Sequence, residues 1–304
     1  MKQPVHGYRF RLFLVSGLAV LLFIASASPT AALTNPTTDL EGVAVAVYGD
    51  DGVDRSGDSW LALAAMFEWM NASVTYVMAS DIRNGTLDDY EIFVMPGGPA
   101  FTYRVFLQED GMEEIINFVS NGGSYFGICG GAEFATTNHL GLHQGRINWG
   151  ILGYGTGTID MTLNVSSTGP DFSDMPEDFT TMYWGSGYFT NITNEVIPIA
   201  RYDMNGLPGM IAFPYGHGSV FLSSPHPEFE EESDRDGTTS FDELDDPDSE
   251  WPMLLRVARW LLESSNVTEN ENTDSIFDSL LVYGTAIIGT AALVAIVAIY
   301  VRRR

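Results

Sequence analysis

The stretch that decides the fold is GGSYFGICGGAEFA, residues 122–135. Ser124–Ile128 is a short apolar run after a Gly-Gly turn, which predicts a buried strand, and Gly130–Ala135 predicts the start of a helix. Cys129 stands between the two with glycines on both sides, as a nucleophile elbow requires. The helix N-terminus behind the sulfur favours the thiolate form. Gly127–Gly131 also fits a small buried cysteine in a glycine-rich turn.

Strand-like and helix-like segments alternate on both sides of this elbow. We expect strands at Val43–Tyr48, Ser73–Met78 and Glu91–Met95, and helices at Asp58–Met70, Gly111–Val119 and Trp251–Leu262. Residues 150–225 are β-rich and end in two strands, Met210–Phe213 and Ser219–Ser223. This alternation predicts an α/β fold with a doubly wound, mostly parallel sheet that is covered on both faces.

Two further segments at strand ends add chemical groups. Met95-Pro96-Gly97-Gly98-Pro99 ends the strand before the elbow, and the N–H groups of Gly97, Gly98 and Gly130 could form an oxyanion hole. His226-Pro227-Glu228 follows the strand GSVFLSS, which puts a base and a carboxylate at another strand end. A cysteine nucleophile needs such a base, and the base needs an orienting acid. Taken singly, the segments also fit an ordinary turn, a loop histidine and the start of an acidic run.

GICGGA after a strand, PGG one strand earlier and SPHPE near the end resemble the class I glutamine amidotransferase superfamily. Within it, the chain is similar to the branch named for the N-terminal domain of some biotin–protein ligases, through YGDDG, MPGG, GGSYFGICGGA and FPYGHGSVFLSSPHPEFE. The likeness spans roughly residues 43–262. It implies a flavodoxin-like sheet and a Cys-His-Glu triad, with Cys129 as nucleophile, His226 as base and Glu228 as its orienter.

The chain departs from that superfamily in ways that bear on substrate. Class I amidotransferases usually have glutamine four residues after the nucleophile, where it helps to bind the glutamine substrate; this chain has Glu133. The sequence includes neither a synthetase domain to accept ammonia nor a biotin-ligase catalytic domain. We therefore expect a cysteine hydrolase that attacks an amide or ester carbonyl of a small or peptide-like substrate and requires no cofactor.

Two alternatives stay open. The first is a non-catalytic ligand-binding or sensor domain on the same fold. The second is an intracellular-protease-like peptidase, in which related elbows occur. In that branch the triad histidine commonly follows the cysteine directly, whereas this chain has Gly130 there. The downstream position of His226 and Glu228 therefore favours the class I arrangement.

The two ends of the chain carry long apolar runs. Residues 1–32 have a basic start, the run LFLVSGLAVLLFIA and then small residues, which predicts a signal peptide. Residues 276–301 hold one charge and are followed by three arginines at 302–304, which predicts a transmembrane helix with a cytoplasmic basic tail. Residues 263–275 read as a polar tether. The domain at 33–262 is thus expected outside the cell membrane on a single-pass anchor.

The exported region is strongly acidic. The signal and anchor segments hold six of the 14 Lys and Arg residues and one of the 40 Asp and Glu residues, which leaves 8 basic and 39 acidic side chains, a net charge of −31. This charge argues against nucleic-acid partners and against a strongly anionic substrate. A single cysteine excludes an intramolecular disulfide. Five sequons are candidates for glycosylation: Asn71, Asn84, Asn164, Asn191 and Asn266.

An acidic loop at 228–250 offers a possible structural calcium site. Glu232, Asp234, Asp236 and Glu243, with Gly237, have nearly the spacing of a twelve-residue calcium loop. The first position is glutamate where aspartate is usual, and Thr239 stands where an aliphatic residue is usual. A merely solvated charge run fits the same residues.

Overall fold

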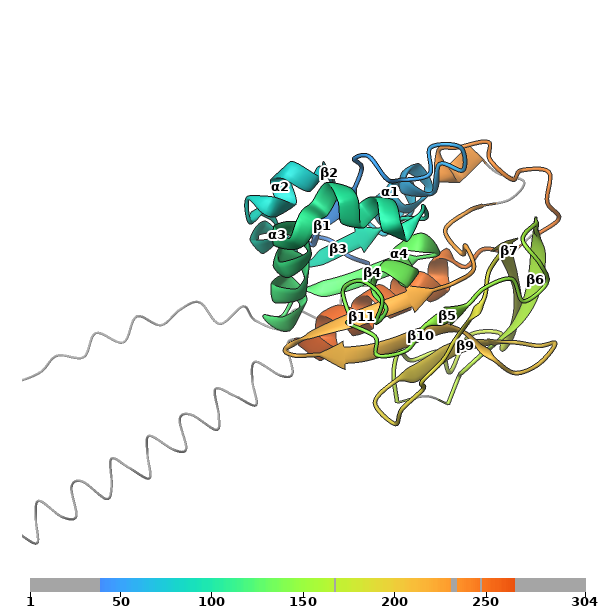
Figure 1. Ribbon diagram of the computed structural model, residues 1–304. Helices are drawn as coiled ribbons and strands as arrows, with labels where there is room; N and C mark the ends of the chain where they lie inside the picture. The colour runs from blue at the N-terminus through green and yellow to red at the C-terminus, as the bar shows by residue number, and fades with distance from the viewer. Residues whose placement is uncertain (1–38, 167, 231–233, 247, 266–304) are drawn as a thin grey trace, which may run out of the picture. The chain divides into compact units, whose positions relative to one another are not determined.

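Residues 39–166, 168–230, 234–246 and 248–265 are described by a computed structural model of the chain (Figure 1). The predicted signal peptide (1–32), the tether beyond residue 265, the predicted transmembrane helix (276–301) and the basic tail lie outside these residues. Among the helices of the described part, none has both the length and the apolar character needed to cross a bilayer.

The described chain forms a nine-stranded sheet in the order β2-β1-β3-β4-β11-β10-β9-β6-β7, and a two-stranded one, β5-β8. The strands are β1 (Ala44–Tyr48), β2 (Ser73–Val77), β3 (Ile92–Met95), β4 (Ser124–Ile128), β5 (Ile147–Asn148), β6 (Thr156–Leu163), β7 (Asp178–Trp184), β8 (Tyr188–Phe189), β9 (Ile197–Tyr202), β10 (Pro208–Tyr215) and β11 (Gly218–Ser223). The helices are α1 (Ser59–Trp69), α2 (Ala79–Arg83), α3 (Ala100–Ser120), α4 (Gly130–Phe134) and a final one at 251–265, with short 3₁₀ turns η1 (Thr86–Asp89) and η2 (Asp234–Asp236).

The sheet has a parallel and an antiparallel part. β2, β1, β3, β4 and β11 run parallel to one another. From β11 onward the sheet continues through β10, β9, β6 and β7 with antiparallel pairing. The parallel part has the strand order 2-1-3-4-5 of the flavodoxin-like fold, with β11 in the fifth place. The predicted flavodoxin-like α/β fold is therefore confirmed, and parallel pairing is confined to this core.

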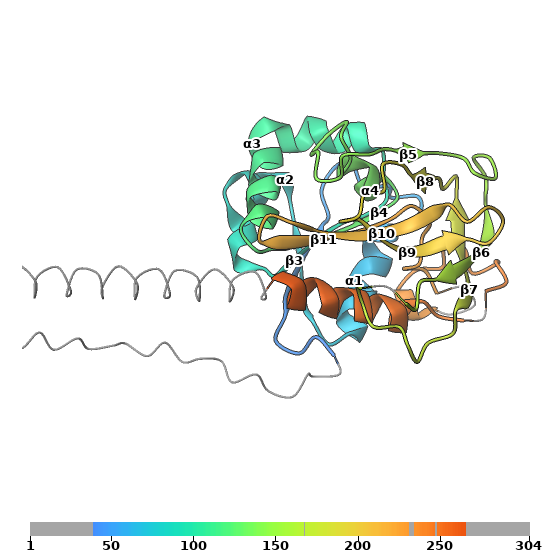
Figure 2. The same ribbon diagram turned by 90° about the horizontal axis from the view of Figure 1, so that it is seen from below.

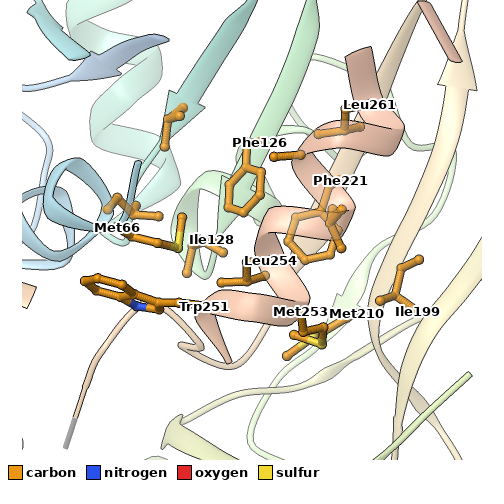
Figure 3. Packing of buried hydrophobic residues seen from close by; sticks show 14 of the residues in the cluster. Met66, Phe126, Ile128, Ile199, Met210, Phe221, Trp251, Met253, Leu254 and Leu261 are labelled. Carbon is orange, nitrogen blue, oxygen red and sulfur yellow. The ribbon is translucent and has the colours of Figure 1, made fainter. Parts of the chain in front are cut away.

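Helices cover both faces of the parallel strands (Figure 2). The α1 helix and the helix at 251–265 pack on one face, and α2, α3 and α4 pack on the other. Figure 3 shows the first face, where Phe126 of β4 and Phe221 of β11 meet Leu254 of the last helix. Because both faces are buried, the central strands consist of almost continuous apolar runs. Such a core holds the strand ends, and the loops after them, in fixed positions.

Candidate active site

Cys129 lies in the predicted turn between β4 and α4, in an unusual backbone conformation. Its φ is 50° and its ψ is −111°, a region that residues other than glycine rarely adopt. The Cys129 N–H donates to the carbonyl oxygen of Ser223 at 2.8 Å, and its carbonyl accepts from the N–H of Glu133 at 2.9 Å. These two hydrogen bonds tie the strained turn to the neighbouring strand β11 on one side and to the helix α4 on the other. The predicted strand–turn–helix elbow is thus present, with the thiol partly exposed.

Glycines around the elbow allow two loops to touch through their backbones. A Cβ atom on Gly130 would lie 1.5 Å from the Gly98 carbonyl oxygen, and one on Gly131 would lie 2.0 Å from the carbonyl oxygen of Met95. Gly98 has a φ of 154°, and its Cβ would lie 2.4 Å from the Gly52 carbonyl oxygen. No side chain fits at these positions, so the loop after β3 and the start of α4 require glycine.

The structure brings His226 and Glu228 together, as the sequence predicts. The His226 Nδ1 atom lies 2.9 Å from the Glu228 Oε1 atom, and both side chains are almost fully buried. The backbone N–H of His226 donates to the carbonyl oxygen of Met182 on β7 at 2.9 Å, which fixes the histidine main chain. Its other ring nitrogen, Nε2, is buried, and the Cys129 side chain acts on the imidazole both through its charge and through a hydrogen bond.

Ser59, which the sequence patterns do not single out, joins this pair to the glycine loop. Its hydroxyl donates to Glu228 Oε1 at 2.6 Å and accepts the N–H of Gly97 at 3.1 Å. Ser59 is the first residue of α1, it is buried, and 169 residues separate it from Glu228. The Glu228 carboxylate is therefore held by two side chains, Ser59 and His226, which together fix its position next to the imidazole.

The electrostatic environment of His226 favours its protonated form. Burial lowers the pKa of the imidazole, but the Glu228 carboxylate and the nearby Cys129 sulfur act in the opposite direction, and the net result is a raised pKa. The rings of Trp184 and Phe229 lie 5.8 and 5.7 Å from the imidazole, centroid to centroid. These aromatic walls exclude water, which strengthens the interaction between the imidazolium and the two acidic groups.

A cavity of about 210 Å³ joins the sulfur to the imidazole. Its lining consists of Asp54, Gly57, Ser59, Gly97, Gly98, Pro99, Cys129, Trp184 and His226. Of the predicted oxyanion-hole residues, Gly97 is unsuited in this arrangement because its N–H is donated to Ser59. Gly130 is the first residue of α4, where the N–H has no acceptor within the helix. Gly98 and Gly130 therefore remain as the candidate donors.

The predicted calcium loop lies only partly within the described residues. Glu232 lies outside the described residues, and Glu243 is exposed. The carboxylate of Asp236 accepts the backbone N–H groups of Glu230 and Thr238, at 3.2 and 3.0 Å, so it shapes the loop itself. The described residues contain one group of acidic side chains whose oxygens could share an ion, and it includes neither Asp234, Asp236 nor Glu243. Calcium binding by Glu232, Asp234, Asp236 and Glu243 stays a prediction.

The sequons differ in exposure. Asn71, Asn84 and Asn191 are exposed, whereas Asn164 is half-buried and its amide donates to the carbonyl oxygen of Pro198 at 2.9 Å. Asn266 lies outside the described residues. The amide nitrogens of Asn71 and Asn191 also donate hydrogen bonds, to Asp39 and to the carbonyl oxygen of Gln144, each at 3.2 Å. Glycosylation stays a prediction, and Asn164 is the least suited of the four described positions because it is the only one that is partly buried.

Removing the Ser59 hydroxyl tests the packing of this site without any substrate. We expect Ser59→Ala to lower the free energy of unfolding by about 1–3 kcal/mol, because a buried carboxylate loses a hydrogen bond and the Gly97 N–H loses its acceptor. Urea denaturation measures the change. Ser173→Ala, at an exposed serine, is the matched control and should stay within about 0.5 kcal/mol. Equal stability of the two variants would contradict the contacts described.

Comparisons with known proteins agree with this architecture. Residues 44–154 match the family model described as biotin-protein ligase, N terminal. An uncharacterized protein of Chlamydia muridarum (strain MoPn / Nigg) is 29% identical over 213 residues, which cover 61% of this chain and 80% of that protein. A structure from Thermoplasma acidophilum, provisionally described as one of the subunits of GMP synthase, has a TM-score of 0.50 at 13% identity and covers 76% of this chain and 98% of its own. A glutamine amidotransferase structure gives a TM-score of 0.49 at 19% identity, with coverage of 74% and 100%.

The chain therefore has the glutamine amidotransferase-like fold, and the resemblance to the biotin–protein ligase N-terminal branch is confirmed for residues 44–154. That match includes the glycine loop after β3 and the Cys129 elbow, but it ends before β11 and the His226-Pro227-Glu228 segment. The arrangement of the histidine and the glutamate is thus known from the geometry of this chain alone.

Proposed function

We propose that this chain is a cysteine-dependent hydrolase of amide or ester bonds, anchored in the cell membrane with its folded domain outside. The observation that carries the proposal is the buried His226–Glu228 pair, whose imidazole shares a small cavity with the Cys129 thiol and interacts with it. A nucleophile, a base and an orienting acid in this order are the minimum for covalent catalysis at a carbonyl. The anchor and the export signal are predictions from residues that the structure does not describe.

The reaction we propose has two halves. The proton of the Cys129 thiol passes to His226 Nε2 before the attack, which leaves the imidazolium that the raised pKa of His226 favours. The sulfur then attacks the carbonyl carbon, and the N–H groups of Gly98 and Gly130 stabilise the oxyanion. The tetrahedral intermediate collapses to a thioester as the imidazolium gives its proton to the leaving amine or alcohol. Water, deprotonated by His226, then attacks the thioester, and the products are a carboxylic acid and the free thiol.

The cavity favours a small or peptide-like substrate without strong negative charge. Its volume of about 210 Å³ holds a side chain or a short segment, and Asp54 adds an acidic group to the wall. Glutamine is not the substrate that we propose. Glu133, at the position where class I amidotransferases usually have glutamine, is half-buried on α4 and does not line the cavity. Burial raises the pKa of the Glu133 carboxyl, while a hydrogen bond from Trp149 lowers it.

The rate of iodoacetamide labelling at different pH values tests the proposed Cys–His pair, because Cys129 is the only cysteine of the chain. We expect the wild type to be labelled at a lower pH than His226→Ala, because the raised pKa of His226 keeps a positive charge beside the sulfur. In His226→Ala that charge is absent, so labelling should need a higher pH. His217→Ala, at an exposed histidine in the turn between β10 and β11, is the matched control.

The same measurement separates the proposal from its main alternative. Identical pH profiles for the wild type and His226→Ala would show that the thiol is not activated, and the non-catalytic binding domain would then be the better interpretation. A shifted profile in His226→Ala but not in His217→Ala supports the hydrolase and justifies a screen of amide and ester substrates.

A further inference from the structure

Three acidic side chains converge just before the last helix, away from the Cys129 cavity. Asp246, Asp248 and Glu250 each offer a carboxylate oxygen, and these oxygens lie within 4.8 Å of one another. Asp246 and Glu250 are buried, with exposed fractions of 1% and 2%, and Asp248 is exposed. Taking like charges out of water at such short distances is costly unless a proton or a cation compensates.

Asp246 is the member of this group that a purely structural role leaves unexplained. Asp248 and Glu250 stand just before the helix at 251–265, where the helix dipole stabilises negative charge. Asp246 is further from the helix start, and neither of its buried carboxylate oxygens has a hydrogen-bond partner among the described residues.

Arg235 is a basic residue of the same region. Its guanidinium forms an ion pair with Glu230, donates to the Ser249 hydroxyl at 2.7 Å, and stacks on the Trp251 ring at 4.4 Å. The charged groups that act on Asp246 include Asp248, Asp160 and Asp245. Asp246 thus has acidic neighbours on several sides, from β6 and from its own loop.

We propose that Asp246, Asp248 and Glu250 bind a hard divalent cation, with Ca²⁺ as the best match. An all-carboxylate donor set suits Ca²⁺ and Mg²⁺ and excludes the softer metals. Two oxygens on opposite sides of one Ca²⁺ ion lie about 4.6–5.2 Å apart, which accommodates the spacing here, and Ca²⁺ tolerates an irregular arrangement better than Mg²⁺. Water completes the coordination on the side of the exposed Asp248.

The site would stabilise the segment that supports Glu228. The carbonyl oxygen of Glu250 accepts the N–H of Leu254 at 2.9 Å, and Trp251 donates its indole N–H to the backbone carbonyl of Glu228 at 2.9 Å. A cation on Glu250 therefore lies one residue from a group that holds the orienting acid in place. This proposal stands on its own geometry and does not depend on the proposed hydrolase activity.

Thermal unfolding of the full chain, in chelator and in CaCl₂, tests the site. At a hundredfold excess over Kd we expect Ca²⁺ to raise the Tm of the wild type by about 5–10 °C. Asp246→Asn should melt at or above the wild-type temperature in chelator, because a repelling charge is gone, and should no longer respond to Ca²⁺. Glu243→Gln, at an exposed acid of the same loop, should respond like the wild type.

Three results would overturn the proposal. They are a wild type without a Ca²⁺ response, an equal response in Asp246→Asn, and a response that disappears in Glu243→Gln instead. Loss of the response in Glu243→Gln would instead support calcium binding at the loop that the sequence pattern predicts. If Asp246→Asn does not fold, Asp248→Asn at the exposed position replaces it, and calorimetric titration with CaCl₂ should then show at least a tenfold weaker Kd than for the wild type.

Discussion

Cys129→Ala is expected to lower the rate of carbonyl hydrolysis by about 10⁴-fold or more, because the covalent intermediate forms on the sulfur. The Ser59 hydroxyl also lines the cavity, but it is already bonded to Glu228 and to the Gly97 N–H. The assay uses p-nitrophenyl acetate first and then any amide that a screen identifies. Cys129→Ser should lose nearly as much, because His226 is set to activate a thiol and the hydroxyl is a far weaker nucleophile at neutral pH. Thermal unfolding should show that both variants remain folded.

Activity that persists in both variants would remove Cys129 from the reaction. If no substrate is turned over by the wild type, but a small molecule binds it and Cys129→Ser with equal affinity, the fold serves recognition and not hydrolysis.

The raised pKa of His226 also predicts how the activity depends on pH. Its imidazolium persists above neutral pH, so the step that protonates the leaving group should fail only in clearly alkaline solution.

Gly130→Ala is expected to have the largest effect on stability, a loss of about 3 kcal/mol or more of the free energy of unfolding. A methyl group there would lie 1.5 Å from the Gly98 carbonyl oxygen, so the glycine loop and the start of α4 must separate. Both candidate oxyanion donors move apart in consequence, and hydrolysis should be lost together with stability. Urea denaturation gives the energetic part of the result.

Gly155→Ala is the matched control for this substitution. A Cβ atom on Gly155 meets nothing within 4 Å, its φ is not positive, and the residue is exposed. We expect its stability to stay within about 1 kcal/mol of the wild type, in the direction of a small gain. A cost below about 1 kcal/mol for Gly130→Ala would show that the two backbones are less close than described.

The sequence predicts the parallel part of the fold well because its strands are buried on both faces. Ser124–Ile128 is a strand with the predicted bounds, since five apolar or small residues between a Gly-Gly turn and the elbow leave little choice. The α3 helix is longer than the predicted Gly111–Val119. It begins at Ala100 and contains a non-helical residue, Gln108, with φ 59°. Exposed Phe101 and Val105 blur the apolar periodicity of its first half, so the pattern does not reveal it.

The site could be predicted only where local sequence marks it. Cys129, His226 and Glu228 each follow a strand, so the topology alone brings them to one edge of the sheet. Ser59 could not be predicted in this way, because no motif near it in the sequence indicates a contact with Glu228. Asp58 occupies the cap position with φ 55° and makes no side-chain capping bond. A contact between residues that are 169 positions apart can be identified only once the fold is known.

The backbone contacts among Gly52, Gly98 and Gly130 determine where this pocket could be redesigned. Each of the last two glycines faces a carbonyl oxygen of another loop, so a substitution at either one would have to be rescued by a simultaneous change elsewhere. Libraries that randomise the glycines would consist largely of unfolded protein. Asp54, Pro99 and Trp184 line the same cavity with side chains. Saturation mutagenesis at these three positions is the economical route to an altered substrate range.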